Sequence, residues 1–256
     1  MQNTPVTTTH PARTDAAKPA RIDALDLARA GALAAMAVFH FVYDLELFGL
    51  LPPGTVGQAG WRWLAYLTAG SFLFLAGASL WLAHGGTIRW RGFWRRWAMI
   101  GGAALVITAG TAIAMPDRFI FFGILHAMAA ASLLGLVCLR LPAGLLVGLA
   151  GVILILPQVA RFSALDAPWF WWTGLQATGL RSVDYVPLFP WFAPFLLGLA
   201  TAKTMAQRGL WGALGRWQAP PGLAIALWAG RHSLAIYLAH QPLLIAAIWI
   251  ALQLRG

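Results

Sequence analysis

The residues of this sequence that are best suited to chemistry are histidines and carboxylates inside long apolar stretches. His40 and Asp44 are four residues apart, a spacing that places both side chains on one face of a helix. A carboxylate one turn away can hold an imidazole in one tautomer and stabilise its protonated form, as it does for general bases in acyl-transfer sites. The pair therefore predicts a catalytic base oriented by a carboxylate. The alternative is a buried His–Asp pair that only fixes helix packing.

Two further polar residues lie in or beside apolar stretches and could join that site. His126 follows an apolar run, and we expect it at the same depth as His40, facing the same cavity. Asp184 precedes a segment with two prolines, Pro187 and Pro190, and such irregular backbone is tolerated in membranes where it lines a cavity. Structural alternatives exist for both, because His126 could be a packed core residue and Asp184 could cap a helix.

Another histidine lies near the C-terminal end of the sequence. His240 and Gln241 are in the middle of an apolar stretch, directly before Pro242, which removes one helix hydrogen bond. The pair predicts contacts with a substrate or, alternatively, contacts between helices. Tyr185 and Trp191, which flank the prolines of the preceding segment, are further candidates for substrate binding.

Arginines concentrate in one short segment of the chain. Guanidinium groups bind phosphates through paired hydrogen bonds, so the segment predicts a phosphate-binding cluster for a nucleotide-bearing donor. Its alternative is a role in membrane topology and in contacts with anionic lipids. Asp26 and Arg29, one turn apart, predict an ion pair. The predicted phosphate ligands are Arg89, Arg91, Arg95, Arg96 and Arg231.

The composition identifies the class of protein that must position these residues. Of the 256 residues, 60% are hydrophobic and only 10% are charged, and the mean hydropathy is +0.71. So few charges cannot cover a water-facing surface, which excludes a soluble enzyme and a disordered chain. A single cysteine, Cys138, excludes a disulfide framework and a cysteine zinc site. Glycine-rich phosphate loops and dinucleotide-binding motifs are absent as well, and we expect no metal cofactor.

Apolar stretches of about 20 residues predict membrane-spanning helices, and seven segments qualify. Residues 1–24 predict a disordered cytoplasmic tail, and residues 25–256 one membrane domain. Residues 209–230 are ambiguous, because their apolar part is too short to span; we interpret them as an interfacial helix, with an eighth span as the alternative. The predicted spans are about 25–50, 61–83, 98–115, 119–139, 143–160, 188–206 and 232–252.

The distribution of charge gives this all-α helix bundle an orientation. The net charge is +10, which in a soluble chain would suggest nucleic acid. With seven spans, most lysines and arginines fall on the side that carries the N-terminus. Cytoplasmic loops of membrane proteins carry such an excess. The charges therefore predict an N-in, C-out topology and no nucleic-acid partner.

Five blocks of sequence, in order, resemble a known family. They look like the bacterial DUF1624 proteins, which are related to the catalytic domain of heparan-alpha-glucosaminide N-acetyltransferase. The resemblance covers nearly the whole membrane region. The blocks are residues 21–29, 36–45, 122–126, 184–191 and 230–242.

The resemblance implies a transmembrane acyltransferase. In that superfamily a cytosolic acyl-CoA, such as acetyl-CoA, donates the acyl group to a sugar amine or hydroxyl on the far side of the membrane. By position, the resemblance implies catalytic roles for His40 and Asp44 in block 36–45, for His126 in block 122–126 and for Asp184 in block 184–191. We expect His40 to act as base or transient acyl carrier, with His126 and Asp184 binding or polarising the acceptor.

A second class of function fits the same buried polar residues. A small proton-coupled transporter, or a component that exports glycans or lipids, would also use His40, Asp44 and His126. Transporters tend to contain internal repeats, and none is convincing here. The expected enzyme is a multi-pass protein of a bacterial inner membrane, with lipids, acyl-CoA and a glycan or amino-sugar acceptor as partners.

Overall fold

The computed structural model describes residues 21–254, and this part of the chain is all-α, as predicted. The expected cytoplasmic tail lies mostly outside the described residues, and its last two residues belong to the first helix. Nine α-helices form within the described part. They are α1 (Asp23–Leu47), α2 (Ala59–His84), α3 (Trp90–Ala114), α4 (Ile124–Cys138), α5 (Ala143–Val159), α6 (Leu188–Gln207), α7 (Leu210–Arg216), α8 (Ala224–Arg231) and α9 (Ser233–Gln253).

Each of the seven predicted spans coincides with one helix, namely α1 to α6 and α9. Four of these, α1, α2, α3 and α9, are long and apolar enough to cross a membrane, and α4 and α5 are shorter apolar helices. α3 begins at Trp90 rather than at residue 98. Its first two turns are helical but rich in arginine, so a prediction from apolar length leaves them out. α4 begins only at Ile124, because the backbone before it pairs with the loop that precedes α6.

The ambiguous segment 209–230 forms two short helices. α7 has seven residues and α8 has eight. At 1.5 Å per residue neither can cross a hydrocarbon core of about 30 Å. The segment that separates them contains Pro220 and Pro221, which restrict the backbone to extended or helix-starting conformations. Residues 209–230 thus contain no helix long enough to be an eighth span, and their short helices agree with the interfacial interpretation.

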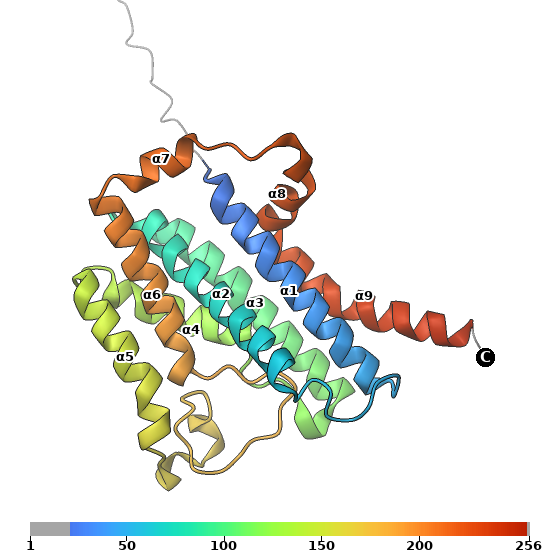
Figure 1. Cartoon of the computed structure of the whole chain (residues 1–256). Helices are drawn as coiled ribbons and strands as arrows, with labels where there is room; N and C mark the ends of the chain where they lie inside the picture. Colours follow the sequence, from blue (N-terminus) through green and yellow to red (C-terminus); the bar gives the residue numbers. More distant parts are fainter. Residues whose placement is uncertain (1–20, 255–256) are drawn as a thin grey trace, which may run out of the picture.

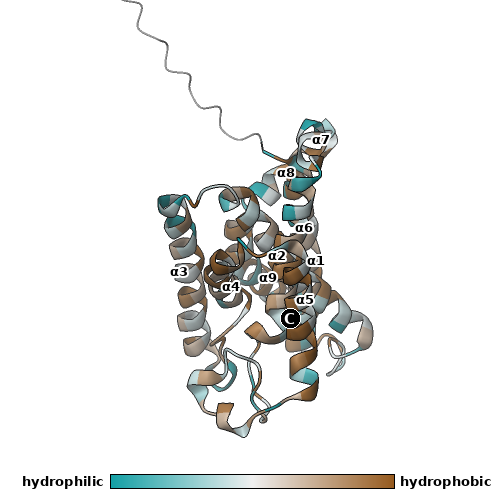
Figure 2. Ribbon diagram, turned by 90° about the vertical axis from the view of Figure 1, so that its left-hand side faces the viewer, coloured by the Kyte–Doolittle hydropathy of each residue, from teal (hydrophilic) through white to brown (hydrophobic). Residues whose placement is uncertain are grey.

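Consecutive long helices run in alternating directions, so the molecule has two distinct ends (Figure 1). One end, here called the arginine end, carries the start of α1, the α2–α3 turn, α7 and α8. The opposite end, the loop end, carries the connections 48–58, 115–123 and 160–187. Hydrophilic residues lie toward both ends, while apolar residues dominate the middle of the bundle (Figure 2).

Close contacts at glycine hold the bundle together at two places. A methyl group at Gly77 or Gly198 would overlap a backbone carbonyl of the facing helix, so α2 and α6 pack backbone to backbone. Gly230 does the same for α8 against Asp26 of α1. α9 packs on α1 with its first half, and its second half runs away from the bundle (Figure 1).

Candidate active site

A cavity of about 740 Å³ extends from the arginine end toward the middle of the bundle. It lies between α1, α2, α3, α4, α8 and α9. Arginines line its outer part, and side chains of Leu25, Leu82, Met99 and Leu234 form apolar walls. Its deep end is formed by Phe72, Ile124, Leu125 and Tyr237. Five arginines line it in total: Arg21, Arg29, Arg89, Arg96 and Arg231.

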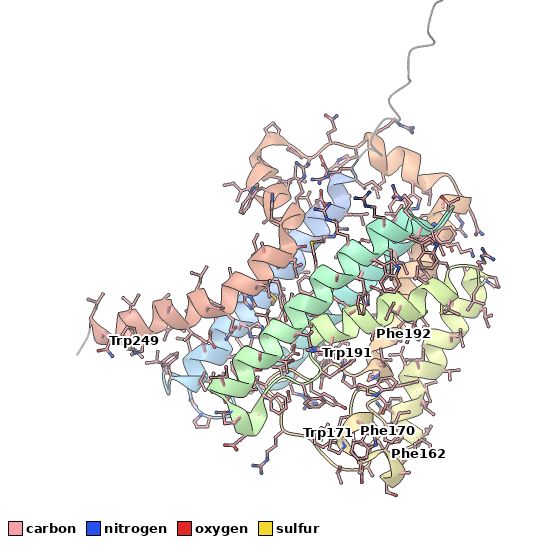
Figure 3. All side chains as sticks on the ribbon, turned by 180° about the vertical axis from the view of Figure 1, so that it is seen from behind. Phe162, Phe170, Trp171, Trp191, Phe192 and Trp249 are labelled. Atoms are coloured by element: carbon pink, nitrogen blue, oxygen red, sulfur yellow. The ribbon has the colours of Figure 1, made fainter. Side chains whose placement is uncertain are left out.

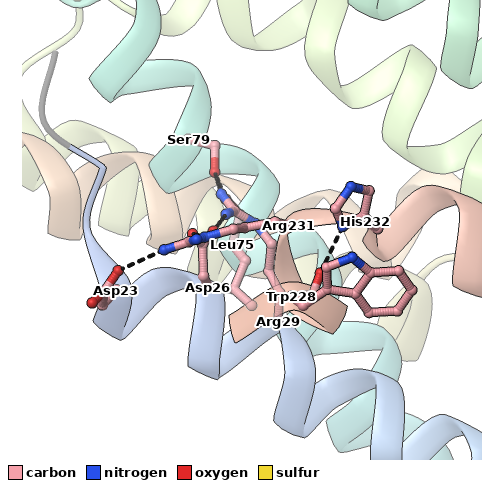
Figure 4. A network of polar contacts seen from close by, with 8 residues as sticks. All are labelled: Asp23, Asp26, Arg29, Leu75, Ser79, Trp228, Arg231 and His232. Atoms are coloured by element: carbon pink, nitrogen blue, oxygen red, sulfur yellow. Dashed lines mark hydrogen bonds and ion pairs between the residues drawn. The ribbon is translucent and has the colours of Figure 1, made fainter. Parts of the chain in front are cut away.

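Two carboxylates of α1 hold two of these arginines in place (Figure 4). Asp26 Oδ1 accepts a hydrogen bond from Arg29 Nη1 at 2.7 Å, which confirms the predicted ion pair. Asp26 Oδ2 accepts from Arg231 Nε at 3.2 Å, and Asp23 Oδ1 accepts from Arg231 Nη2 at 3.1 Å. Arg29 Nη2 also donates to Ser79 Oγ at 2.7 Å. Fixed guanidinium groups lose less freedom when they bind a phosphate.

The structure divides the predicted phosphate ligands into two groups. Arg89, Arg96 and Arg231 line the cavity, whereas Arg91 and Arg95 are exposed outside its lining. Sequence reasoning missed two lining arginines, Arg21 and Arg29, because the first was assigned to the tail and the second to an ion pair. Arg96 forms no hydrogen bond or ion pair with any residue that the structure describes, so its guanidinium is free to bind a ligand.

A second polar group, here called the histidine cluster, lies between α1 and α9. It consists of His40 and Asp44 from α1 and His240 and Gln241 from α9. The rings of the two histidines have their centres 5.0 Å apart. Gln241 Nε2 donates to Asp44 Oδ1 at 2.6 Å. The cluster thus joins residues of the first and last predicted spans.

The partner of Asp44 differs from the prediction. Asp44 does not hydrogen-bond to His40, although both lie on the same face of α1. α9 packs against this face, and its Gln241 donates the hydrogen bond that Asp44 accepts. His40 Nδ1 and Asp44 Oδ2 are both buried without a partner among the described residues. The structure therefore contains no direct hydrogen bond between Asp44 and His40, although both residues belong to the histidine cluster.

The hydrogen bonds of the cluster fix which of its atoms are acceptors. His240 Nδ1 contacts the backbone carbonyl of Tyr237, which can only accept, so Nδ1 carries the proton and Nε2 of the neutral ring is an acceptor. The amide of Gln241 donates to Asp44, so its Oε1 faces elsewhere. Asp44 Oδ2, His240 Nε2 and Gln241 Oε1 are all buried without partners in the described chain. Three buried acceptors thus lack a donor, which is costly unless a ligand supplies one.

Tyr237 connects the cavity to the histidine cluster. It lines the deep end of the cavity, and its ring centre lies 5.5 Å from that of His240. Its hydroxyl forms no hydrogen bond with the described residues. Sequence reasoning missed Tyr237, although its position three residues before His240 places both on one helix face. α1 also links the two sites, since Asp26 contributes to the arginine end and His40 to the cluster.

His126 and Asp184 lie together at the start of α4, outside the histidine cluster. His126 Nδ1 accepts from Gly123 N–H at 3.3 Å, and its Nε2 lies 3.2 Å from Thr108 Oγ1. Asp184 Oδ2 accepts from Ile124 N–H at 3.0 Å, so it caps α4 rather than the helix that follows it in sequence. Burial raises the pKa of the Asp184 carboxyl to about 6, against the opposing effect of that hydrogen bond. Both residues have the contacts expected of their structural alternatives.

Tyr185 and Trp191 lie at the loop end and are engaged in packing. The hydroxyl of Tyr185 donates to the carbonyl of Trp171 at 2.6 Å and accepts from Gln176 Nε2 at 2.8 Å. Trp191 meets Tyr66 edge-on, with ring centres 5.9 Å apart. In Figure 3, Trp171, Phe162 and Phe170 gather in the loop beneath α5, far from Trp249 on α9. Neither predicted residue lines the cavity.

Comparison with known families identifies the chain. The profile of the family described as "Heparan-alpha-glucosaminide N-acetyltransferase, catalytic" matches residues 21–242. The chain belongs to this family. The resemblance drawn from the five sequence blocks is thereby confirmed. No curated protein and no solved structure matches the chain.

Membership of the heparan-alpha-glucosaminide N-acetyltransferase catalytic family assigns the chain to the membrane-bound acetyltransferases. The matched range begins with Arg21, which lines the cavity, and ends at Pro242, directly after Gln241. It therefore contains the complete cavity and the complete histidine cluster. The second half of α9, which leaves the bundle, lies beyond it. No group of three or more His, Cys, Asp and Glu side chains in residues 21–254 is arranged to hold a metal ion.

Proposed function

We propose that this chain transfers an acetyl group from acetyl-CoA, bound in the cavity, to the amine of a sugar held at the histidine cluster. The observation that carries the proposal is the position of Tyr237 between the two sites. It lines the deep end of the arginine-lined cavity and lies beside His240 of the cluster. A donor and an acceptor that enter from opposite sides would meet at this residue.

The cavity suits the chemistry of coenzyme A. The phosphates would bind at Arg89, Arg96 and Arg231, with Asp26 holding the last of these in position. The apolar walls would surround the thin pantetheine arm and direct the thioester toward Tyr237. The unpartnered hydroxyl of Tyr237 is available to hydrogen-bond the thioester carbonyl oxygen, on which negative charge develops during transfer.

The histidine cluster favours an amine over a hydroxyl as acceptor. Asp44 Oδ2, His240 Nε2 and Gln241 Oε1 each lack a donor. An ammonium group offers three N–H donors and a positive charge that Asp44 would balance, whereas a hydroxyl offers one donor. The description of the family, heparan-alpha-glucosaminide N-acetyltransferase, agrees with this preference for an amine.

The reaction needs a base and a proton donor at the meeting point. The ammonium group loses one proton to His40, whose Nδ1 is buried without a partner. The amine nitrogen then attacks the thioester carbonyl carbon, the new C–N bond forms and the C–S bond breaks. The CoA thiolate takes the second proton from nitrogen, so the products are the amide, free CoA and one proton that leaves through His40. His126 and Asp184 position the start of α4, which supplies Ile124 and Leu125 to the deep end of the cavity.

The proposed topology has seven spans with the arginine end in the cytosol, in the inner membrane if the source is a bacterium. Its support is the concentration of arginines at that end and the alternation of the helices (Figure 1). Single cysteines in a Cys138→Ser background test it. Thr55→Cys at the loop end should react with an impermeant maleimide in intact cells, and Gly222→Cys only after the cells are opened. The reverse pattern would overturn the orientation.

The activity test uses purified protein in lipid nanodiscs with radiolabelled acetyl-CoA and a panel of amino sugars. Wild-type protein should form the N-acetylated sugar, and His40→Ala should reduce the rate by about 100-fold or more, the usual contribution of a general base. His232→Ala is the matched control, because His232 is exposed at the arginine end. Undiminished transfer by His40→Ala would remove His40 as the base.

A further inference from the structure

The cavity has a side wall that helix packing does not close. α3 packs mainly on α4, whereas α9 packs on α1 and α8, yet α3 and α9 both line the cavity. Seen from behind, the two helices flank α1 (Figure 3). Met99 of α3 lines the cavity and is 52% exposed. A ligand can therefore reach the cavity sideways, between α3 and α9, from the surrounding lipid.

The order of side chains along α3 fits an amphiphile that carries an anionic group. Arg89 and Arg96 lie toward the arginine end, and Met99 and Ile100 follow one turn deeper. Leu234 of α9 faces the same space. The cations therefore lie nearer the arginine end and the apolar side chains lie deeper. A phospholipid has the same order, with its phosphate at the membrane surface and its acyl chains below.

Tryptophans place this level of α3 at the membrane interface. Trp90 and Trp94 are 54% and 48% exposed and lie, like Arg96, within the first two turns of α3. Tryptophan is enriched at the headgroup level of membranes. Arg96 therefore lies at the depth of lipid phosphates and has no ion-pair partner among the described residues. The five lining arginines face one lining carboxylate, Asp26, so the cavity has an excess of positive charge.

We propose that an anionic phospholipid of the adjacent leaflet binds in this cavity. Its phosphate lies at Arg96 and Arg89, and one acyl chain lies along Met99, Ile100 and Leu234. The occupant is a lipid rather than a soluble phosphate because the entrance is apolar and open to the bilayer. The site uses arginines that the proposed function assigns to acetyl-CoA, so the lipid and acetyl-CoA compete. Lipid binding itself does not depend on acetyl transfer.

Photolabelling in nanodiscs tests the proposal without acetyl-CoA. The probe is phosphatidylglycerol with a diazirine in one acyl chain, and phosphatidylcholine with the same chain is the headgroup control. Mass spectrometry should locate the phosphatidylglycerol label on peptides that contain Met99 or Leu234. Arg96→Gln should reduce this labelling about tenfold, the effect of losing one charge-assisted contact. Arg95→Gln, the same charge change outside the cavity lining, should leave it unchanged, and added acetyl-CoA should displace the lipid.

Three results would overturn the site. They are equal labelling by the two lipids, equal losses in Arg96→Gln and Arg95→Gln, or a label spread evenly over lipid-facing residues of α5 such as Val152. Labelling that persists at saturating acetyl-CoA would refute the shared position. The same experiment on His40→Ala separates this inference from the proposed function, because a protein inactive in acetyl transfer should still be labelled. An active enzyme without specific labelling would refute the lipid site alone.

Discussion

Replacing Gly230 with alanine tests how closely α8 must approach α1. A methyl group at this position would overlap the backbone carbonyl oxygen of Asp26. Carbon and oxygen atoms in ordinary contact lie about 3.5 Å apart, so α8 must move away from α1 by roughly an ångström or more. Arg231 is the next residue along α8, and the movement carries its guanidinium away from Asp23 and Asp26.

The contacts of Arg231 set the size of the effect. Its bonds to Asp26 and Asp23 measure 3.2 and 3.1 Å, so the movement takes both beyond hydrogen-bonding distance. The side chain is 36% exposed, and such pairs contribute about 0.5–1 kcal/mol each. Overpacking adds about 1–3 kcal/mol, and the better helix propensity of alanine returns about 1 kcal/mol. The expected loss of stability is about 2 kcal/mol, and displacing Arg231 should weaken acetyl-CoA binding severalfold.

Thermal unfolding of the purified protein, followed by tryptophan fluorescence, measures the loss of stability, and equilibrium titration measures the affinity for acetyl-CoA. Gly31→Ala is the matched control, because Gly31 lies in α1 and a methyl group there meets open space. Gly31→Ala should unfold at the wild-type temperature or above and bind acetyl-CoA normally. If Gly230→Ala matched this control in both measurements, the close contact would not position Arg231.

Three further outcomes follow from the site. Arg96→Gln should raise the KM for acetyl-CoA about tenfold with little change in kcat, whereas Arg95→Gln should change neither; equal effects would show that surface charge rather than the cavity binds the donor. Tyr237→Phe should lower kcat by about tenfold or more while acetyl-CoA binding persists, and an unchanged kcat would exclude a role for the hydroxyl. Burial raises the pKa of Asp184 to about 6, above roughly 4 in the unfolded chain, so the folded state binds this proton more tightly. Its contribution to stability is therefore complete below about pH 4 and lost as the pH rises through about 6, and between about pH 5 and 7 the unfolding temperature of wild type should fall more than that of Asp184→Asn.

The helices were largely predictable because apolar length is a local property of the sequence. The seven predicted spans coincide with seven helices, and the short helices of 209–230 follow from its prolines and short apolar run. The start of α4 was not predictable from hydropathy. Residues 119–123 are as apolar as the helix that follows, but Val186 N–H donates to the carbonyl of Phe122, and this pairing with a distant loop keeps the backbone out of the helix.

The site was predictable in its residues and less so in its contacts. Helical spacing placed His40 and Asp44 on one face, yet the partner of Asp44 is Gln241, nearly 200 positions away. Periodicity within one helix cannot say which helix packs against that face. Arg95 and Arg96 are adjacent in sequence and equally basic, and only the direction of each side chain around α3 separates the one that lines the cavity from the one that does not.

α1 also sets the distance between the arginine end of the cavity and the histidine cluster. Asp26 and Arg29 at its start hold the arginine end of the cavity, and His40 belongs to the cluster deeper in the bundle. Along a helix, Asp26 and His40 are about 21 Å apart. Under the proposed function, the donor therefore needs a long, narrow arm to bind the arginines and still reach the cluster. One inserted residue between these positions would turn His40 by about 100° and shift it by about 1.5 Å, so the spacing, more than the intervening residues, is what α1 must keep.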